Sequence, residues 1–149
     1  MFLHVANREA AVAWFNSIHR QKATRVKMDY SAVPHAVYSH PQIASVGLRE
    51  EEARRDHHHI LVGRTRYRDT AKGEAMMEEE GFAKAIVDAH SGAILGFHII
   101  GPYAPMLIQE VTNAMASGGD PHVIERGMHI HPALSELIPV TLAGVEEAE

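Results

Sequence analysis

The 149-residue chain contains no cysteine, and this absence excludes disulfide scaffolds, thiolate zinc sites and cysteine nucleophiles. The chain also has no apolar run of membrane-spanning length and no basic-then-apolar leader, so we expect a cytoplasmic protein without a membrane partner. The formal net charge is −5, which gives no general attraction to nucleic acid. The classes that remain are enzymes, small-ligand binding modules and association domains.

Histidine is the one residue type in clear excess, with 12 copies. The copies are scattered, apart from the run at 57–59, which lies between a predicted helix and a predicted strand. Successive side chains of a strand point to opposite faces, so three neighbouring imidazoles are poorly placed to bind one ion. We therefore predict a surface turn there and no metal ligands. A histidine-rich metal-binding domain stays open as a further hypothesis, which metal analysis of the purified protein would test.

Apolar periodicity and turn residues divide the chain into a helical start, a strand-rich middle and a helical end. Helices are expected at Arg8–His19, Arg49–Arg55, Ala104–Ser117 and about Pro132–Leu142, with a helical turn at Thr70–Met77 and a short helix from Asp120 to Gly127. Strands are expected at Ala36–Ser39, Ile43–Gly47, Ile60–Arg68, Phe82–Val87 and Ile94–Ile100. The composition between the last two strands is typical of a hairpin turn. Strands followed by helices indicate an α+β fold, in which helices pack on one side of an antiparallel sheet.

The segment His129–Ile138, which reads HIHPALSELI, is the one with clear acid/base potential. Proline disfavours helical backbone in the residue before it, so His131 should lie just outside the last helix, with Pro132 in its first turn. Glu136, about one turn in, is placed to fold its carboxylate back toward the imidazole, fix its tautomer and favour the protonated ring. Spacing alone favours a simpler interpretation, a helix-capping histidine beside a solvated glutamate.

Several other stretches of the chain, like this segment, resemble one protein family. Residues 37–48 read VYSHPQIASVGL and are similar to "vFTdPeiAsVGlteeeA", a pattern of the pyridine nucleotide-disulfide oxidoreductases. HIHPALSE resembles HAHPTLSE, the ending of the class I, dihydrolipoamide dehydrogenase-like members. Residues 81–84 and 92–102 resemble the family's two central strands, and residues 107–110 resemble the start of its long helix. One departure is Arg49, where the family has threonine, and it predicts a weaker cap for the helix that follows.

The resemblance implies an interface domain that forms most of a two-fold homodimer. In such a dimer His131 would reach into the partner's active site and act as acid/base toward a redox-active dithiol beside FAD, and Glu136 would orient its imidazole. The His131–Pro132 bond resembles a family position that is cis, which would aim the ring and bring this segment, Pro132 included, against the flavin. An X-Pro bond has only a small trans preference, so a cis bond is accessible here.

The beginning of the chain fits the same family. Residues 2–6 read FLHVA and resemble "mLAHkA", at the start of the last helix of the FAD domain. The resemblance implies that Met1, Phe2, Leu3 and His4 contact FAD in a complete protein, where the helix dipole favours negative charge on the reduced ring. We therefore expect residues 1–29 to be a remnant FAD-domain helix plus a polar linker, and residues 30–149 to be the C-terminal interface domain.

The chain lacks the glycine-rich FAD motif, the CxxxxC redox pair and the glycine-rich nicotinamide motif of that family. We therefore expect a fragment of an FAD- and NAD(P)-dependent oxidoreductase, inactive alone, without bound cofactor and colourless as a purified dimer. A non-catalytic dimerisation module is the alternative hypothesis, as are parents of the mercuric reductase-like or glutathione reductase-like kind. The HxHP ending without a terminal cysteine pair favours the lipoamide type over the mercury-reducing type.

Overall fold

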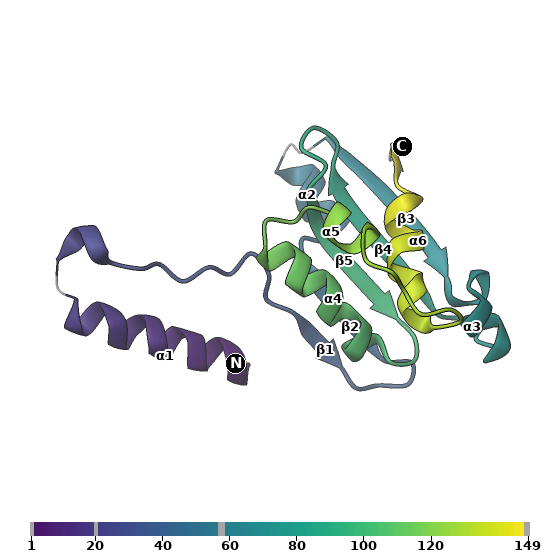
Figure 1. Cartoon of the computed structure of the whole chain (residues 1–149), viewed down its shortest axis with the longest axis horizontal. Helices are drawn as coiled ribbons and strands as arrows, with labels where there is room; N and C mark the ends of the chain where they lie inside the picture. The colour runs from purple at the N-terminus through teal and green to yellow at the C-terminus, as the bar shows by residue number, and fades with distance from the viewer. Residues whose placement is uncertain (1, 20, 57–58, 148–149) are drawn as a thin grey trace.

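The computed structural model describes residues 2–19, 21–56 and 59–147, and in this part the chain forms one six-stranded antiparallel sheet with helices on both faces (Figure 1). The strands are β1 His35–Val37, β2 Ile43–Gly47, β3 Ile60–Arg66, β4 Phe82–Asp88, β5 Ile94–Ile100 and β6 Glu146–Glu147. Their order across the sheet is β1-β2-β5-β4-β3-β6, so β4 and β5 form its centre. The α+β class expected from the sequence is confirmed.

The central hairpin forms where two apolar strands flank turn residues. Asp88 closes this turn, because its Oδ1 accepts hydrogen bonds from the backbone N–H of His90 at 3.1 Å and of Ser91 at 2.7 Å. Gly92 follows with a φ of 73°, a left-handed conformation that glycine adopts without steric cost. The hairpin predicted between the two strands is therefore confirmed.

The main core lies between the sheet and three helices, α4 (Ala104–Ala116), α5 (His122–Glu125) and α6 (Leu137–Ala143), which cover the face nearer the viewer in Figure 1. Every second strand residue points into this core, as the pleat of a strand requires. Its fully buried members include Ala44, Val46, Ala83, Ala85, Phe97, Val111, Leu137 and Ile138. Burial of this apolar surface is the main driving force that fixes α4 and α6 on the sheet.

Helix α2 (Glu50–Arg55) packs on the opposite face of the sheet, whereas the sequence predicted helices on one side. Its Ala53 is fully buried and forms a second, small cluster with Ile60 and Ile86. Ile86 alternates along β4 with residues that face the main core, which is why it reaches the other side. The Arg49 side chain makes no N-cap hydrogen bond, and the Glu52 carboxylate accepts the Arg49 backbone N–H at 2.9 Å.

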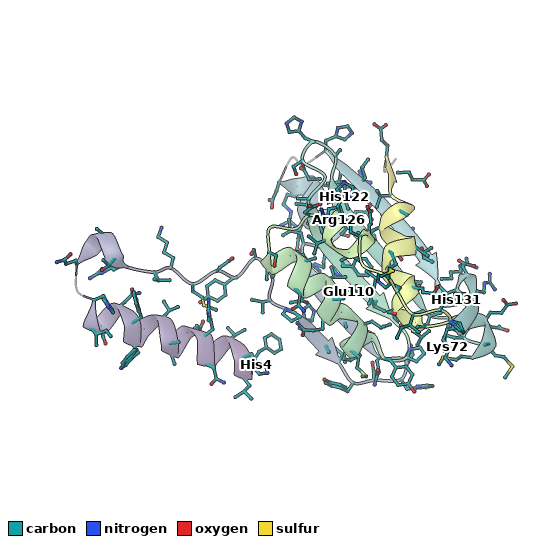
Figure 2. All side chains as sticks on the ribbon, in the orientation of Figure 1. His4, Lys72, Glu110, His122, Arg126 and His131 are labelled. Carbon is teal, nitrogen blue, oxygen red and sulfur yellow. The ribbon has the colours of Figure 1, made fainter. Side chains whose placement is uncertain are left out.

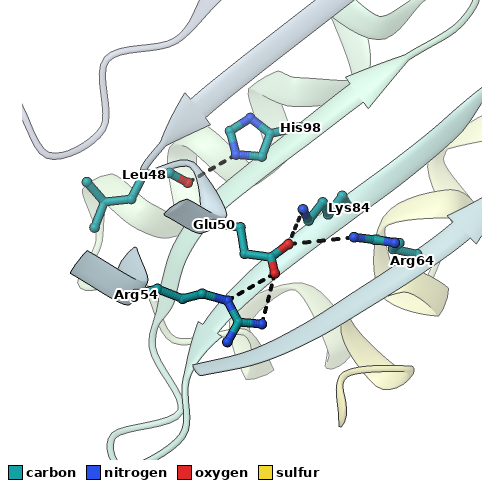
Figure 3. A network of polar contacts seen from close by, with 6 residues as sticks. All are labelled: Leu48, Glu50, Arg54, Arg64, Lys84 and His98. Atoms are coloured by element: carbon teal, nitrogen blue, oxygen red, sulfur yellow. Dashed lines mark hydrogen bonds and ion pairs between the residues drawn. The ribbon is translucent and has the colours of Figure 1, made fainter. Parts of the chain in front are cut away.

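A carboxylate at the start of α2 ties this helix to the sheet (Figure 3). Glu50 forms a hydrogen-bonded ion pair with Lys84 of β4, and its carboxylate also contacts Arg54 at 3.0 Å and Arg64 of β3 at 3.6 Å. The hydrogen bond with Lys84 is the main cause that lowers the pKa of Glu50. Three cations from two strands and one helix thus converge on one carboxylate.

Strand β3 ends earlier than expected. Its last residue is Arg66, and Tyr67–Asp69 forms a 3₁₀ turn instead of continuing the strand to Arg68. Tyr67 is fully buried and donates its hydroxyl hydrogen to the Pro102 carbonyl at 2.9 Å, so tertiary packing overrides the alternating pattern here. Burial also raises the Tyr67 pKa well above its ordinary value. The short helix α3 (Ala71–Ala75) follows, in the position predicted for a helical turn.

Helix α1 runs from Leu3 to Ile18, so it begins five residues before the predicted start, and no residue of it is buried. It projects from the sheet on a linker in Figure 1, and the linker is irregular except for a 3₁₀ turn over residues 22–24. Three hydrogen bonds tie the helix to the linker. Tyr30 Oη donates to Glu9 Oε1 at 2.7 Å, Asn16 Nδ2 donates to the Val26 carbonyl at 2.9 Å, and the Val26 N–H donates to Asn16 Oδ1 at 2.9 Å. No described helix is both long and apolar enough to cross a membrane.

The last helix begins later than predicted. Ala133 has φ −145° and ψ 154°, an extended conformation, so a helix starting at Pro132 cannot pass through it. A 3₁₀ turn covers Leu134–Glu136, and α6 starts only at Leu137. Glu136 is therefore the residue that precedes α6, not one turn inside a helix.

Candidate active site

His131 and Glu136 meet at the entrance to α6. The Nδ1–H of His131 donates a hydrogen bond to Glu136 Oε1 at 2.8 Å. The other carboxylate oxygen of Glu136 accepts the Ala133 backbone N–H, also at 2.8 Å. One carboxylate thus closes the 3₁₀ turn and holds the imidazole, a contact that the sequence predicted although it placed the helix start too early.

The electrostatics of the pair follow from these two bonds. The backbone N–H of Ala133 is the main cause that lowers the pKa of Glu136, and the hydrogen bond from His131 adds to it. Glu136 therefore stays ionised under neutral and mildly acidic conditions, and it stabilises positive charge on the ring it contacts. A charged carboxylate at this position also fixes the tautomer, because only an Nδ1–H can donate to it.

The His131 ring is open to solvent on the side away from Glu136. Its side chain is 70% exposed, whereas the Glu136 side chain is 23% exposed. Nδ1 is committed to the carboxylate, which leaves Nε2 as the nitrogen that can exchange a proton with another molecule. The peptide bond between His131 and Pro132 is cis, as the resemblance implied, and a second cis bond at His40–Pro41 was not foreseen.

The candidate cofactor contacts at the beginning of the chain lie at the start of α1. Met1 falls outside the described residues. Phe2 stacks on the His35 ring with centroids 6.4 Å apart, and Leu3 is 72% exposed. Phe2 occupies the N-cap position and makes no side-chain hydrogen bond, so no side chain caps the first N–H groups of the helix. Free N–H groups at a helix start are suited to an anionic group.

These two groups of candidates are far apart within one chain. His4, at the start of α1, and His131, beside α6, are separated in Figure 2, where Glu110 of α4 lies between them in this view. A hollow beside α1 is lined by residues 2–5 together with residues of β1 and α4, and neither His131 nor Glu136 is among them. The described chain therefore does not bring the candidate pair His131 and Glu136 to its own candidate flavin contacts.

Only His59 of the histidine run at 57–59 lies within the described part of the chain. His57 and His58 lie outside the described residues, and His59 has Glu147 as its ion-pair partner, 3.7 Å away. No group of three or more histidine, aspartate or glutamate side chains is close enough to hold a metal ion among residues 2–19, 21–56 and 59–147.

The segment His129–Ile138 makes one further contact that was not predicted from the sequence. The His129 ring contacts Glu110 Oε1 of α4 through Nε2 and the Gly127 carbonyl through Nδ1, each at 3.1 Å. The spacing of His129 and His131, two residues apart, is visible in the sequence. Nothing in the sequence, however, indicated that a glutamate 19 positions earlier would lie against the first of them.

Residues 33–141 match the dimerisation domain of the pyridine nucleotide-disulphide oxidoreductases. The chain belongs to this family. The match covers all of β1 to β5 and the His131–Glu136 pair, so both the sheet and the candidate site lie inside the family domain.

Curated relatives of the family match the chain over most of its length. A mycothione reductase from Mycobacterium tuberculosis is 40% identical over 145 residues, which are 95% of this chain and 32% of the relative. A dihydrolipoyl dehydrogenase from Bacillus subtilis is 34% identical over 135 residues, which are 91% of this chain and 28% of the relative. The chain thus spans between 20% and 32% of the length of the curated relatives it matches.

Solved structures show the same fold. A flavoprotein disulfide reductase of Escherichia coli, RclA, superposes with a TM-score of 0.81 at 22% identity, over 96% of this chain and 32% of that one. LpdA from Mycobacterium tuberculosis superposes with a TM-score of 0.76 at 18% identity, over 88% of this chain and 28% of that one.

Proposed function

We propose that the chain is the C-terminal interface domain of an FAD- and NAD(P)-dependent, dihydrolipoamide dehydrogenase-like disulfide oxidoreductase, and that His131 and Glu136 form its acid/base pair. The observation that carries the proposal is the 2.8 Å hydrogen bond from His131 Nδ1 to Glu136 Oε1, with the ring otherwise open to solvent. Proton exchange with a thiol requires an imidazole that a carboxylate holds in one orientation and that the thiol can reach.

The proposed step is a proton transfer. Nε2 of His131 accepts the proton of a substrate thiol, so the S–H electron pair stays on sulfur and the ring becomes an imidazolium stabilised by Glu136. The resulting thiolate attacks one sulfur of a disulfide, forms a new S–S bond with it and releases the other sulfur as a thiolate. In the reverse direction the imidazolium returns the proton to a thiolate. Histidine suits both directions because its ordinary pKa lies close to neutral pH.

FAD, when bound, supplies the acceptor for the two electrons of the dithiol, and the nicotinamide exchanges them with the flavin. The residues at the start of α1 fit such a group. Phe2, Leu3 and His4 are exposed, and the helix N-terminus carries no side-chain cap. Together with Pro132 beside the acid/base histidine, they are the residues we propose to contact FAD in the assembled enzyme.

The same proposal divides the chain at the linker. Residues 1–29 would belong to the FAD domain and residues 30–149 to the interface domain, which is supported by the start of the family match at residue 33 and by the absence of buried residues in α1. The interface domain would form a homodimer. Large apolar side chains stand exposed on α4 and around His131, namely Tyr103, Met106, Met128 and Ile130. A cytoplasmic location is part of the proposal, because thiols are kept reduced there.

A mycothione-type disulfide reductase is a second candidate. It is favoured by the 40% identity to the mycobacterial mycothione reductase over 95% of this chain. The two candidates share the acid/base pair and differ in the disulfide, so kcat/KM of the complete enzyme for lipoamide and for mycothione distinguishes them.

The test of the acid/base role uses a complete enzyme that carries this chain, for example the mycobacterial mycothione reductase with its matching stretch replaced by this chain. His131→Gln should lower turnover by about 10²–10⁴-fold, the range for lost general acid/base catalysis. His90→Gln, in the exposed β4–β5 turn, is the matched control and should keep full turnover. Near-normal turnover of the His131 variant would leave the chain as a non-catalytic association module.

A further inference from the structure

The segment between α5 and α6 is held by few backbone hydrogen bonds in the described structure. Within the described residues, no backbone–backbone hydrogen bond joins residues 128–132 to another part of the chain. Met128 and Ile130 are 102% and 77% exposed. His131 lies in this stretch, so its position depends on side-chain contacts at the two ends of the stretch.

At one end, Glu136 holds His131 from the start of α6. At the other end, His129 is the single residue between Glu125 and Pro132 that is not exposed, and its side chain is 16% accessible. Its neighbours in sequence point into solvent, whereas the His129 ring turns inward onto α4. His129 therefore serves as the anchor of the stretch on the side of α5.

Both ring nitrogens of His129 are engaged. Nε2 lies 3.1 Å from Glu110 Oε1, and Nδ1 lies 3.1 Å from the Gly127 carbonyl. Both partners are acceptors, so the neutral ring donates its one N–H to one of them, and the protonated ring can donate to both. The Glu110 side chain is 37% accessible, and Glu110 belongs to a helix whose Ile108 and Val111 are buried in the main core. The stretch is thus connected to a rigid element of the fold.

We propose that His129 and Glu110 are positioning residues for His131. This inference rests on the proposed acid/base role of His131. His129 is separated from His131 by one residue, so a displacement of its ring is transmitted to the His131 backbone. Glu136 alone then holds the acid/base ring by a single hydrogen bond from a side chain that is 70% exposed. With both anchors in place, the backbone on each side of His131 is fixed and the ring keeps one orientation.

A first experiment measures ring orientation in the 149-residue chain without reference to activity. The ¹⁵N chemical shifts of the His131 ring, taken at a pH where the ring is neutral, show which nitrogen carries the proton. We expect the Nδ1–H tautomer in the unmodified chain, because Glu136 accepts that hydrogen. His129→Ala and Glu110→Leu should shift the ring toward the mixture of tautomers of a free histidine.

Two variants serve as controls. Glu110→Gln retains an oxygen acceptor for the His129 N–H and should restore the Nδ1–H signature. His122→Ala removes a histidine of the same local type, which contacts Glu125 at 2.7 Å in α5, and should leave the His131 shifts unchanged. Far-UV circular dichroism confirms that each variant is folded. Unchanged His131 shifts in folded His129→Ala and Glu110→Leu would overturn the proposal.

A second experiment measures turnover in the complete enzyme. His129→Ala should lower kcat by roughly tenfold to a hundredfold, the cost of a misplaced catalytic group, with little change in KM. It should have almost no effect in a His131→Gln background, because it acts through that ring. An additive loss in the double variant would contradict the positioning role. A normal turnover of His131→Gln alone would refute the proposed function, whereas the tautomer measurement would still decide the positioning of the ring.

Discussion

Glu50 is a single carboxylate on which much of the contact between α2 and the sheet depends. Its side chain and that of Lys84 are 22% and 19% exposed, so their ion pair is partly shielded from water. Arg54 and Arg64 approach the same carboxylate from α2 and β3 (Figure 3). Removal of the negative charge would leave three cations close together, which is unfavourable in partly buried surroundings.

The lowered pKa of Glu50 predicts a pH dependence of stability. A carboxyl group with a depressed folded-state pKa contributes stability above its unfolded value, about 4.3 for glutamate, and loses it as the pH falls through the folded value. Glu50→Gln should therefore reduce the free energy of unfolding by about 1 kcal/mol at pH 7 and flatten its decline below pH ~4.3. Urea unfolding between neutral and acidic pH measures both effects.

Glu51→Gln is the matched control, because Glu51 is exposed on the same helix and removal of its charge leaves the Glu50 contacts in place. It should retain the acid-dependent decline of the unmodified chain. If Glu50→Gln and Glu51→Gln gave the same pH profile, the ion pairs at Glu50 would contribute nothing that depends on its charge.

The close packing of α6 against the sheet requires a small residue in β3, Gly63. A Cβ added at Gly63 would lie 2.2 Å from the Thr141 carbonyl oxygen of α6 and 3.0 Å from Val145 Cγ1. Backbone atoms cannot yield as a flexible side chain would, so the helix must move away from the sheet. Because Glu136 immediately precedes α6, this close approach also sets the place of the acid/base pair.

Gly63→Ala should consequently destabilise the fold by about 1–3 kcal/mol, the usual cost of overpacking a core. Chemical unfolding of the 149-residue chain measures the change. Gly144→Ala is the control at the end of α6, where the nearest atom to an added Cβ is 3.4 Å away, and it should change stability by less than about 0.5 kcal/mol. Equal stability of Gly63→Ala and the unmodified chain would show that this close contact does not determine the position of α6.

Elements whose signal is local could be predicted, and elements fixed by distant contacts could not. Ile43–Gly47 and Ile94–Ile100 were predicted with the bounds that the structure has, because each is a short β-prone run bordered by turn residues. The start of α6 was wrong because the 3₁₀ turn depends on the fold-back of Glu136. The strand order, the place of α2 and the strand β6 come from pairings between distant residues, which periodicity does not encode.

Of the contacts in the candidate site, too, the local one could be predicted from the sequence and the distant one could not. The contact of His131 with Glu136 spans five residues and could be inferred from their spacing. The contact of His129 with Glu110 spans 19 residues, joins two elements and was found only in the structure. Sequence pattern therefore identified the pair that we propose to exchange protons and missed the pair that we propose to position it.

At the scale of the whole molecule, the central claim is that His131 acts in the active site of a partner subunit. His131 and the start of α1 are separated within one chain (Figure 2), and the family match is to a dimerisation domain. A two-fold dimer brings the same surface of each subunit against the other, so each subunit can complete the other's site.

Mixed dimers of the complete enzyme test this claim most directly. One subunit carries His131→Gln with an intact dithiol pair in its upstream part, and the other keeps His131 but has that dithiol pair replaced. Each homodimer should be inactive. Statistical mixing should restore about a quarter of the unmodified turnover, because half of the dimers are mixed and each has one complete site. Mixed dimers, verified by affinity tags on both subunits, that stay as inactive as the two parents would contradict a site shared between subunits.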